Sequence, residues 1–136
     1  MQKQRYRWWR FIRRVVRAYP ALKSEYEELH RQSLSQDISG MPKAQAAGRT
    51  VESIALRQMS PDDQKDYDAV SRAIEATRSR QDGEKRLALI RYVYWYEKEH
   101  TVSHAAPVLG ISEATAKRWH GDFIKLVAKY RGFHVF

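Results

Sequence analysis

Cysteine is absent from the 136 residues, and no apolar run approaches the ~20 residues that a membrane-spanning helix needs. The lack of thiols excludes disulfide bonds and thiolate metal sites, which suits a cytoplasmic protein. The positive residues near the N-terminus are not followed by an uninterrupted apolar stretch or a small-residue cleavage site, so we expect no secretory signal. These absences predict a cytoplasmic protein without a membrane partner.

Glycine and proline are also scarce, with six and four residues, and strand-like alternation of apolar and polar residues is rare. An apolar fraction of 43% is enough for a folded core. Helical periodicity dominates, so the fold class that we expect is all-α. The length suits one domain, or one small domain with an extended arm.

The first expected helix runs from about Lys3 to Ser33. We expect it to be interrupted or bent at Pro20, because proline lacks the amide hydrogen and its ring clashes with the preceding turn. A polar loop at 36–49 shows no periodicity, and a short helix from about Thr50 to Gln58 follows it. This half of the chain is therefore expected to form a helical hairpin or a coiled-coil-like arm.

The sequence "SPDD" marks the start of the next helix. Ser60 suits the N-cap and Pro61 the first helical position, where a missing amide hydrogen costs nothing. This helix is expected to run to about Arg80, and another, rich in large apolar residues, to occupy about 84–99. Two further helices are expected to close the chain.

Acidic residues are outnumbered by lysine and arginine, 16 to 25, and the resulting charge of +9 is unevenly placed. Residues 1–20 hold seven basic side chains and no acid, and residues 101–136 carry a net charge of +3. The middle, 21–100, is left at about −1. Two basic ends around a nearly neutral middle favour a polyanionic partner, although lysine and arginine also serve simply to solvate helix faces.

Apolar residues near the N-terminus recur at alternating intervals of four and three, the heptad period of a helix that packs along another helix. This seam comprises Trp8, Ile12, Val15, Tyr19, Leu22, Tyr26 and Leu29. A membrane-surface helix would also have one basic and one apolar face, but anionic lipid would repel the acids of "LKSEYEEL". We therefore expect helix packing, either within the chain or across a dimer.

Most N-terminal arginines lie off this seam, where they would add sequence-independent affinity for DNA that falls steeply with salt. Trp9 and Phe11 also lie off the seam and fill either the edge of a core or the space between two bases, with packing the safer expectation. A homo-oligomer, dimer or higher, would suit a palindromic site. The candidates for phosphate contacts are Arg5, Arg7, Arg10, Arg13 and Arg14.

The most specific pattern is "VSHAAPVLGISEATAKRWH", which fits a helix-turn-helix. Such a motif needs a glycine in the left-handed conformation at the turn and a small residue where the two helices touch. Gly110 suits the turn, and Ala106 lies four positions before it. Ala116 and Trp119 then fall on the buried side of the second helix. Pro107 requires a late helix start, at about residue 103, or a local bend.

The outer side of the second helix, about 112–120, would enter the major groove of DNA. Arg118 and Lys117 suit guanine edges or phosphates, and Thr115 suits a phosphate or a thymine methyl group. Glu113 is either a cytosine contact or a favourable charge at a helix N-terminus. The C-terminal candidates for DNA binding are Ser112, which also suits the N-cap, Glu113, Thr115, Lys117, Arg118, His104 and Lys125.

Together these patterns predict two domains. Residues 1–82 are expected to form the helical arm or oligomerisation region, with the basic N-terminus and the loop at 36–49. Residues 83–136 are expected to form a trihelical helix-turn-helix unit that binds double-stranded DNA. The alternative for this second unit is an ordinary three-helix core that has no contact with DNA.

Between about Tyr19 and Phe133 the chain resembles the RinA-type phage transcriptional regulators. This family is related to the ArpU-like late regulators, and its C-terminal unit is similar to region 4 of sigma factors. The resemblance is carried by "ISGMP" at 38–42, "GEKRLALIRYVYW" at 83–95 and "HTVSHAAPVLGISEATAKRWHGDFIKLVA" at 100–128. It implies an activator of late phage genes, carried by a phage or prophage and acting in the bacterial cytoplasm.

The chain departs from this family pattern at two places. Members often have a glycine-rich stretch after "MP", where this chain has "KAQAAGR". The N-terminal stretch "RYRWWRFIRR" is also richer in arginine and tryptophan than the resemblance implies. The functions of these two segments therefore have to be argued separately.

Catalytic and metal-binding patterns are missing. His100 and His104 are four residues apart, but no third ligand has a suitable spacing, so we expect no metal and no other cofactor. The acids near residue 62 suit helix capping and solvation better than two-metal chemistry. No phosphate-binding glycine loop or nucleophile motif occurs in the sequence, so an enzyme is not expected.

Three functions fit these observations. The first is a sequence-specific DNA-binding activator of phage or prophage late genes. The second is a small terminase subunit, a ring that marks DNA for packaging. The third is an adaptor whose trihelical unit docks on host RNA polymerase without touching DNA. Oligomer size separates the first two functions, and the effect of replacing Arg118 on DNA affinity separates the third.

Overall fold

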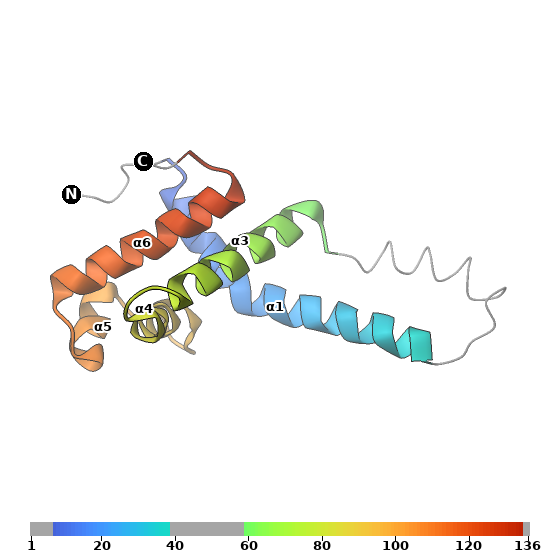
Figure 1. Cartoon of the computed structure of the whole chain (residues 1–136), viewed down its shortest axis with the longest axis horizontal. Coiled ribbons are helices and arrows are strands. Elements are labelled where there is room, and N and C mark those ends of the chain that lie inside the picture. Colours follow the sequence, from blue (N-terminus) through green and yellow to red (C-terminus); the bar gives the residue numbers. More distant parts are fainter. Residues whose placement is uncertain (1–6, 39–58, 135–136) are drawn as a thin grey trace.

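The computed structural model describes residues 7–38 and 59–134, and all regular secondary structure within them is helical (Figure 1). The all-α fold class is therefore confirmed. Arg5, the segment 39–58 and the short helix expected within that segment lie outside the described residues. The elements, labelled as in Figure 1, are α1 (Trp9–Ile38), α3 (Pro61–Arg78), α4 (Gly83–Ile90), the π-helix η1 (Arg91–Trp95), α5 (Val102–Leu109) and α6 (Glu113–Arg131).

Helix α1 continues through Pro20 and ends at Ile38, so the expected interruption does not occur. Proline has no amide hydrogen to donate to the carbonyl four residues earlier, which is that of Val16. That carbonyl oxygen instead accepts a hydrogen bond of 2.7 Å from Nε1 of Trp95. A side chain of η1 thus supplies the donor that the helix lacks.

Helix α3 begins as the sequence predicts. Ser60 is its N-cap, with Oγ accepting the amide of Asp63 at 3.1 Å, and Pro61 is its first residue. The helix ends at Arg78, close to the expected end. The next turn is tight: a Cβ atom on Gly83 would lie 2.6 Å from the carbonyl oxygen of Thr77, so only glycine fits there.

The segment expected to be one helix over about 84–99 consists of α4 and the π-helix η1, which ends at Trp95. A π-helix admits one extra residue per turn and turns the following side chains relative to an α-helix. In η1, Val93 and Tyr94 are buried, and Trp95 reaches α1. The earlier end of this helix brings the amide of His100 to the carbonyl oxygen of Val93, at 3.3 Å.

The core is shared by both ends of the chain. Ile12, Val15 and Val16 of α1 are buried in one cluster with residues of α3, α4, η1, α5 and α6. The seam of α1 therefore packs within the chain up to Leu22, whereas Tyr26 is exposed. Val16, which the heptad pattern omits, is fully buried. The expected boundary at residue 82 coincides with the turn between α3 and α4, and the core extends across it.

Partly shielded ion pairs attach α6 to α3 and α4. Arg131, near the C-terminal end of α6, places Nε 2.6 Å from Oδ1 of Asp66 in α3, and these side chains are only 15% and 17% exposed. Arg86 of α4 lies 3.3 Å from Asp122 and covers the ring of Trp119 at 5.1 Å. Because these groups are partly shielded from water, they hold α6 more firmly than exposed pairs would.

Candidate nucleic-acid interface

The turn between α5 and α6 has the geometry that the sequence predicts. Gly110 lies in the left-handed region, with φ 70° and ψ 33°, which favours glycine. Ile111 then donates its amide to the carbonyl oxygen of Ala106 at 3.0 Å, closing the end of α5. Ala106, Ala116 and Trp119 are all buried as expected.

Helix α5 starts at Val102, close to the late start that Pro107 requires. Its N-cap is Thr101, whose Oγ1 accepts the amide of His104 at 3.0 Å. Pro107 lies in the second turn, where it removes the one intrahelical hydrogen bond that an amide at this position would donate to the carbonyl oxygen of Ser103. The result is a short helix that packs against the N-terminal half of α6.

Ser112 caps α6, with Oγ accepting the amide of Thr115 at 3.0 Å and donating to the Thr115 hydroxyl at 2.9 Å. Glu113 pairs with Lys117 one turn later, at 2.8 Å. Hydrogen bonds from Lys117 and then from Ser103 lower the pKa of Glu113, so this carboxylate is ionised at neutral pH. The start of α6 is therefore polar, and its side chains bond to one another.

The C-terminal candidates for DNA binding are only partly brought together. Ser112, Glu113, Lys117 and Arg118 are exposed at the start of α6, and Thr115 is half-buried beside them. The other two candidates lie elsewhere. His104 is exposed on α5, and Lys125 is half-buried in the middle of α6.

His104 is engaged in an aromatic cluster at the edge of α5. Its Nδ1 lies 3.1 Å from the hydroxyl of Tyr92, and its ring stacks on His100 with 5.3 Å between centroids. Stacked, nearly parallel imidazoles at this separation suit packing better than the convergent nitrogens of a shared metal ion. Within the described residues, no group of three potential metal ligands occurs.

The N-terminal arginines have two different environments. Arg7, Arg10 and Arg14 are exposed. Arg13 is half-buried, and its Nε donates to the hydroxyl of Tyr94 at 2.9 Å. Arg17 pairs with Glu99 at 2.6 Å. Arg13 thus binds η1, which leaves the three exposed arginines as the described candidates for phosphate contacts.

Sequence reasoning missed a buried link from α1 through η1 to α6. The Tyr94 hydroxyl that accepts from Arg13 also lies 2.5 Å from Nε2 of His120, which is buried. Burial, and secondly the charge of Arg13, lower the pKa of His120 to about 4, so its ring is neutral at neutral pH and shares a hydrogen bond with the Tyr94 hydroxyl. The spacing of His120 from Ala116 was the available signal, because it puts both on the inner side of α6.

A cleft of about 460 Å³ separates the first turn of α4 from that of α6. Lys85 and Arg86 line it from α4, and Ser112, Thr115 and Arg118 line it from the α6 side. Arg86 is held by Asp122, as described above. Within the described part of the chain, neither Lys85 nor Arg118 has an ion-pair partner.

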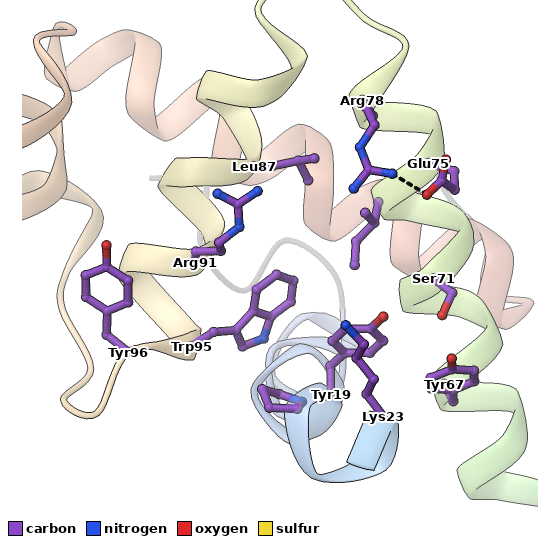
Figure 2. A pocket seen from close by; sticks show the side chains of 12 residues that line it. Tyr19, Lys23, Tyr67, Ser71, Glu75, Arg78, Leu87, Arg91, Trp95 and Tyr96 are labelled. Atoms are coloured by element: carbon purple, nitrogen blue, oxygen red, sulfur yellow. Dashed lines mark hydrogen bonds and ion pairs between the residues drawn. The ribbon is translucent and has the colours of Figure 1, made fainter. Parts of the chain in front are cut away.

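A larger cleft, of about 700 Å³, lies between α1, α3 and η1 (Figure 2). Tyr19 and Trp95 form one side, with ring centroids 5.3 Å apart. Its arginines are paired: Arg78 binds Glu75, and both Arg78 and Arg91 approach Glu84, at 3.4 and 3.8 Å. The larger cleft therefore offers an anion less uncompensated charge than the cleft between α4 and α6.

Comparison of the chain with models of known protein families, with curated proteins and with solved structures gives no match. The resemblance to phage regulators therefore stays a prediction from the sequence motifs. None of the helices within 7–38 and 59–134 is long and apolar enough to cross a membrane.

Proposed function

We propose that the protein is a sequence-specific DNA-binding regulator of transcription. In this proposal α4 with η1, α5 and α6 form a helix-turn-helix unit, and α6 is the recognition helix. One observation carries it: the N-terminal half of α6 exposes a polar, basic side next to the turn at Gly110, while its opposite side is buried. A helix presented in this way is what the major groove of DNA admits.

The exposed side has suitable chemistry for base edges. Lys117 offers donors for guanine, and the ionised Glu113 offers acceptors for the amino group of cytosine. In the free protein these two side chains bind each other at 2.8 Å. Exposed pairs of this kind contribute little to stability, so DNA can separate the pair at low cost.

The biological assignment rests on the resemblance in sequence. It gives an activator of phage or prophage late genes that acts in the cytoplasm of the bacterial host, with host RNA polymerase as a further partner. The exposed Arg7, Arg10 and Arg14 support binding to a polyanion, because nothing in α1 neutralises this group of charges near its start. No catalytic role is proposed.

The test is selection of bound sequences from a random pool of double-stranded DNA, followed by footprinting and fluorescence anisotropy. We expect one short motif to be enriched and protected, with affinity that survives competitor DNA. Enrichment of no motif, with binding that is equal for all fragments and vanishes as salt rises, would contradict the proposal.

A further inference from the structure

We propose that the cleft between α4 and α6 binds one backbone phosphate of the DNA, between the ammonium group of Lys85 and the guanidinium group of Arg118. This inference rests on the proposed function and deepens it. It assigns a function to α4, for which the sequence motifs predicted no DNA contact. It also assigns Arg118 to the backbone, whereas the sequence left its choice between base and phosphate open.

The two cations line the same cleft and come from different helices, Lys85 from α4 and Arg118 from α6. Both side chains are exposed, and neither has an ion-pair partner within the described residues. Arg86, the third cation of the cleft, is occupied by Asp122 and by the ring of Trp119. Lys85 and Arg118 are therefore the charges that remain available for a ligand.

The neutral groups of the cleft also suit an acceptor such as phosphate. The hydroxyl of Thr115 accepts a hydrogen bond from Ser112, which leaves its own hydrogen to donate. Asp82 is the one acid among the residues that line the cleft, and it is exposed just before the start of α4. Its single negative charge does not cancel the charges of Lys85 and Arg118.

The other arginine-rich concavity provides the contrast. In the larger cleft, Arg78 binds Glu75, as Figure 2 shows. Arg78 and Arg91 also approach Glu84 of α4, beside this cleft. A phosphate would have to displace these carboxylates. In the smaller cleft, Lys85 and Arg118 have no carboxylate partner within the described residues, and the cleft borders the N-terminus of α6, which carries a partial positive charge.

A phosphate held at this place would set the register of α6 in the groove. Lys85 belongs to α4 and Arg118 to α6, and Arg86 with Asp122 ties these helices together. A contact that spans both helices orients the whole unit, as backbone contacts do in protein–DNA complexes. Base discrimination is then left to Glu113 and Lys117.

The experiment measures the affinity of Lys85→Ala for the selected motif and for a scrambled DNA at several salt concentrations. If Lys85→Ala loses a phosphate contact, the slope of log K against log salt becomes less steep by up to about 0.9. Binding to both DNAs weakens by the same factor. Lys85→Arg keeps the charge and should keep the wild-type slope. Melting curves establish that each variant is folded.

Lys65→Ala is the matched control. Lys65 is an exposed lysine next to Asp66, which binds Arg131 at the opposite end of α6. A helix rises ~1.5 Å per residue, so Arg131 lies about 20 Å along α6 from Arg118. This distance exceeds the ~8 Å screening length at physiological salt. The Lys65→Ala variant should therefore show the same salt slope as the wild type.

Two further variants test whether Lys85 and Arg118 share one phosphate: Arg118→Ala, and the double variant that combines it with Lys85→Ala. If both cations hold one phosphate, the double variant lowers the slope by about 0.9, whereas two separate phosphates would give about 1.8 and overturn the shared site. Relaxed preference at one base position in Arg118→Ala would also overturn it.

The two proposals fail in different ways. A wild-type protein that selects no motif contradicts the proposed function. A wild-type protein that selects a motif, together with a Lys85→Ala variant that keeps the wild-type slope, contradicts the phosphate site alone.

Discussion

Trp95 donates its indole N–H to the carbonyl oxygen of Val16, the acceptor that Pro20 leaves without a backbone donor. The bond joins residues 79 positions apart and ties η1 to α1. Figure 2 shows the indole reaching toward α1 beside Tyr19. A proline that would otherwise break a helix thus becomes the place where the N-terminal helix is attached to the rest of the fold.

Replacing Trp95 by phenylalanine should leave the Val16 carbonyl without a donor. We expect the free energy of unfolding to fall by about 1–3 kcal/mol, the usual cost of an unsatisfied buried polar group. In a Pro20→Ala background residue 20 regains its amide, so the same substitution should cost less. Urea denaturation of the four proteins measures this coupling. Equal costs in both backgrounds would show that the bond does not compensate for the proline.

The buried His120 predicts a loss of stability in acid. Its pKa is lowered to about 4 in the folded chain, against 6.5 for an ordinary histidine, so the unfolded chain binds the proton first as pH falls. The free energy of unfolding that depends on a neutral His120 is fully present above pH 6.5. It falls by up to about 3 kcal/mol between pH 6.5 and 4.

The matched variant for this prediction is His120→Gln, whose side-chain amide can still hydrogen-bond to the Tyr94 hydroxyl but does not titrate. Free energies of unfolding between pH 7 and 4 should fall less steeply for the variant than for the wild type. Parallel curves would mean that His120 is accessible to protons in the folded protein.

Gly83 and Gly121 form a second matched pair. A Cβ atom at Gly83 would lie 2.6 Å from the carbonyl oxygen of Thr77, so Gly83→Ala should lower the free energy of unfolding by about 1–3 kcal/mol. A Cβ atom at Gly121 meets only the ring of Trp9 at 3.9 Å, an ordinary contact. Gly121→Ala should be neutral or stabilising, because alanine favours helices. Thermal melting compares them, and similar losses in both variants would refute the steric argument.

Local signals in the sequence predicted the starts of α3 and α6 and the turn at Gly110, whereas α1 and η1 end at other residues than expected. Each N-cap, Ser60, Thr101 or Ser112, accepts the amide of the residue three positions later. Gly110 turns the chain because glycine can adopt a left-handed backbone conformation. Only the capping by Thr101 was not anticipated. Such contacts depend on few residues, and a pattern of a few letters therefore predicts them.

The contacts that sequence reasoning missed join distant segments. Pro20 is tolerated because of Trp95, and the pairing of Arg13 with Tyr94 and His120 needs three helices in place. Sequence reasoning missed Lys85 for the same reason, because the packing of α4 on α6 brings Lys85 and Arg118 to the same cleft. No local periodicity contains this information, since tertiary packing decides which side chains meet.

Oligomeric state bears on the choice between regulation and DNA packaging. The N-terminal seam is buried within one chain at Ile12, Val15 and Leu22, so these residues cannot also form a dimer seam unless α1 is released. We expect a dimer or tetramer built on other surfaces, since a two-fold axis matches a palindromic operator. Sedimentation velocity at micromolar concentration measures this state. A monomer would remove the dimer hypothesis, and a ring of about eight or more subunits would favour the small terminase subunit over the regulator.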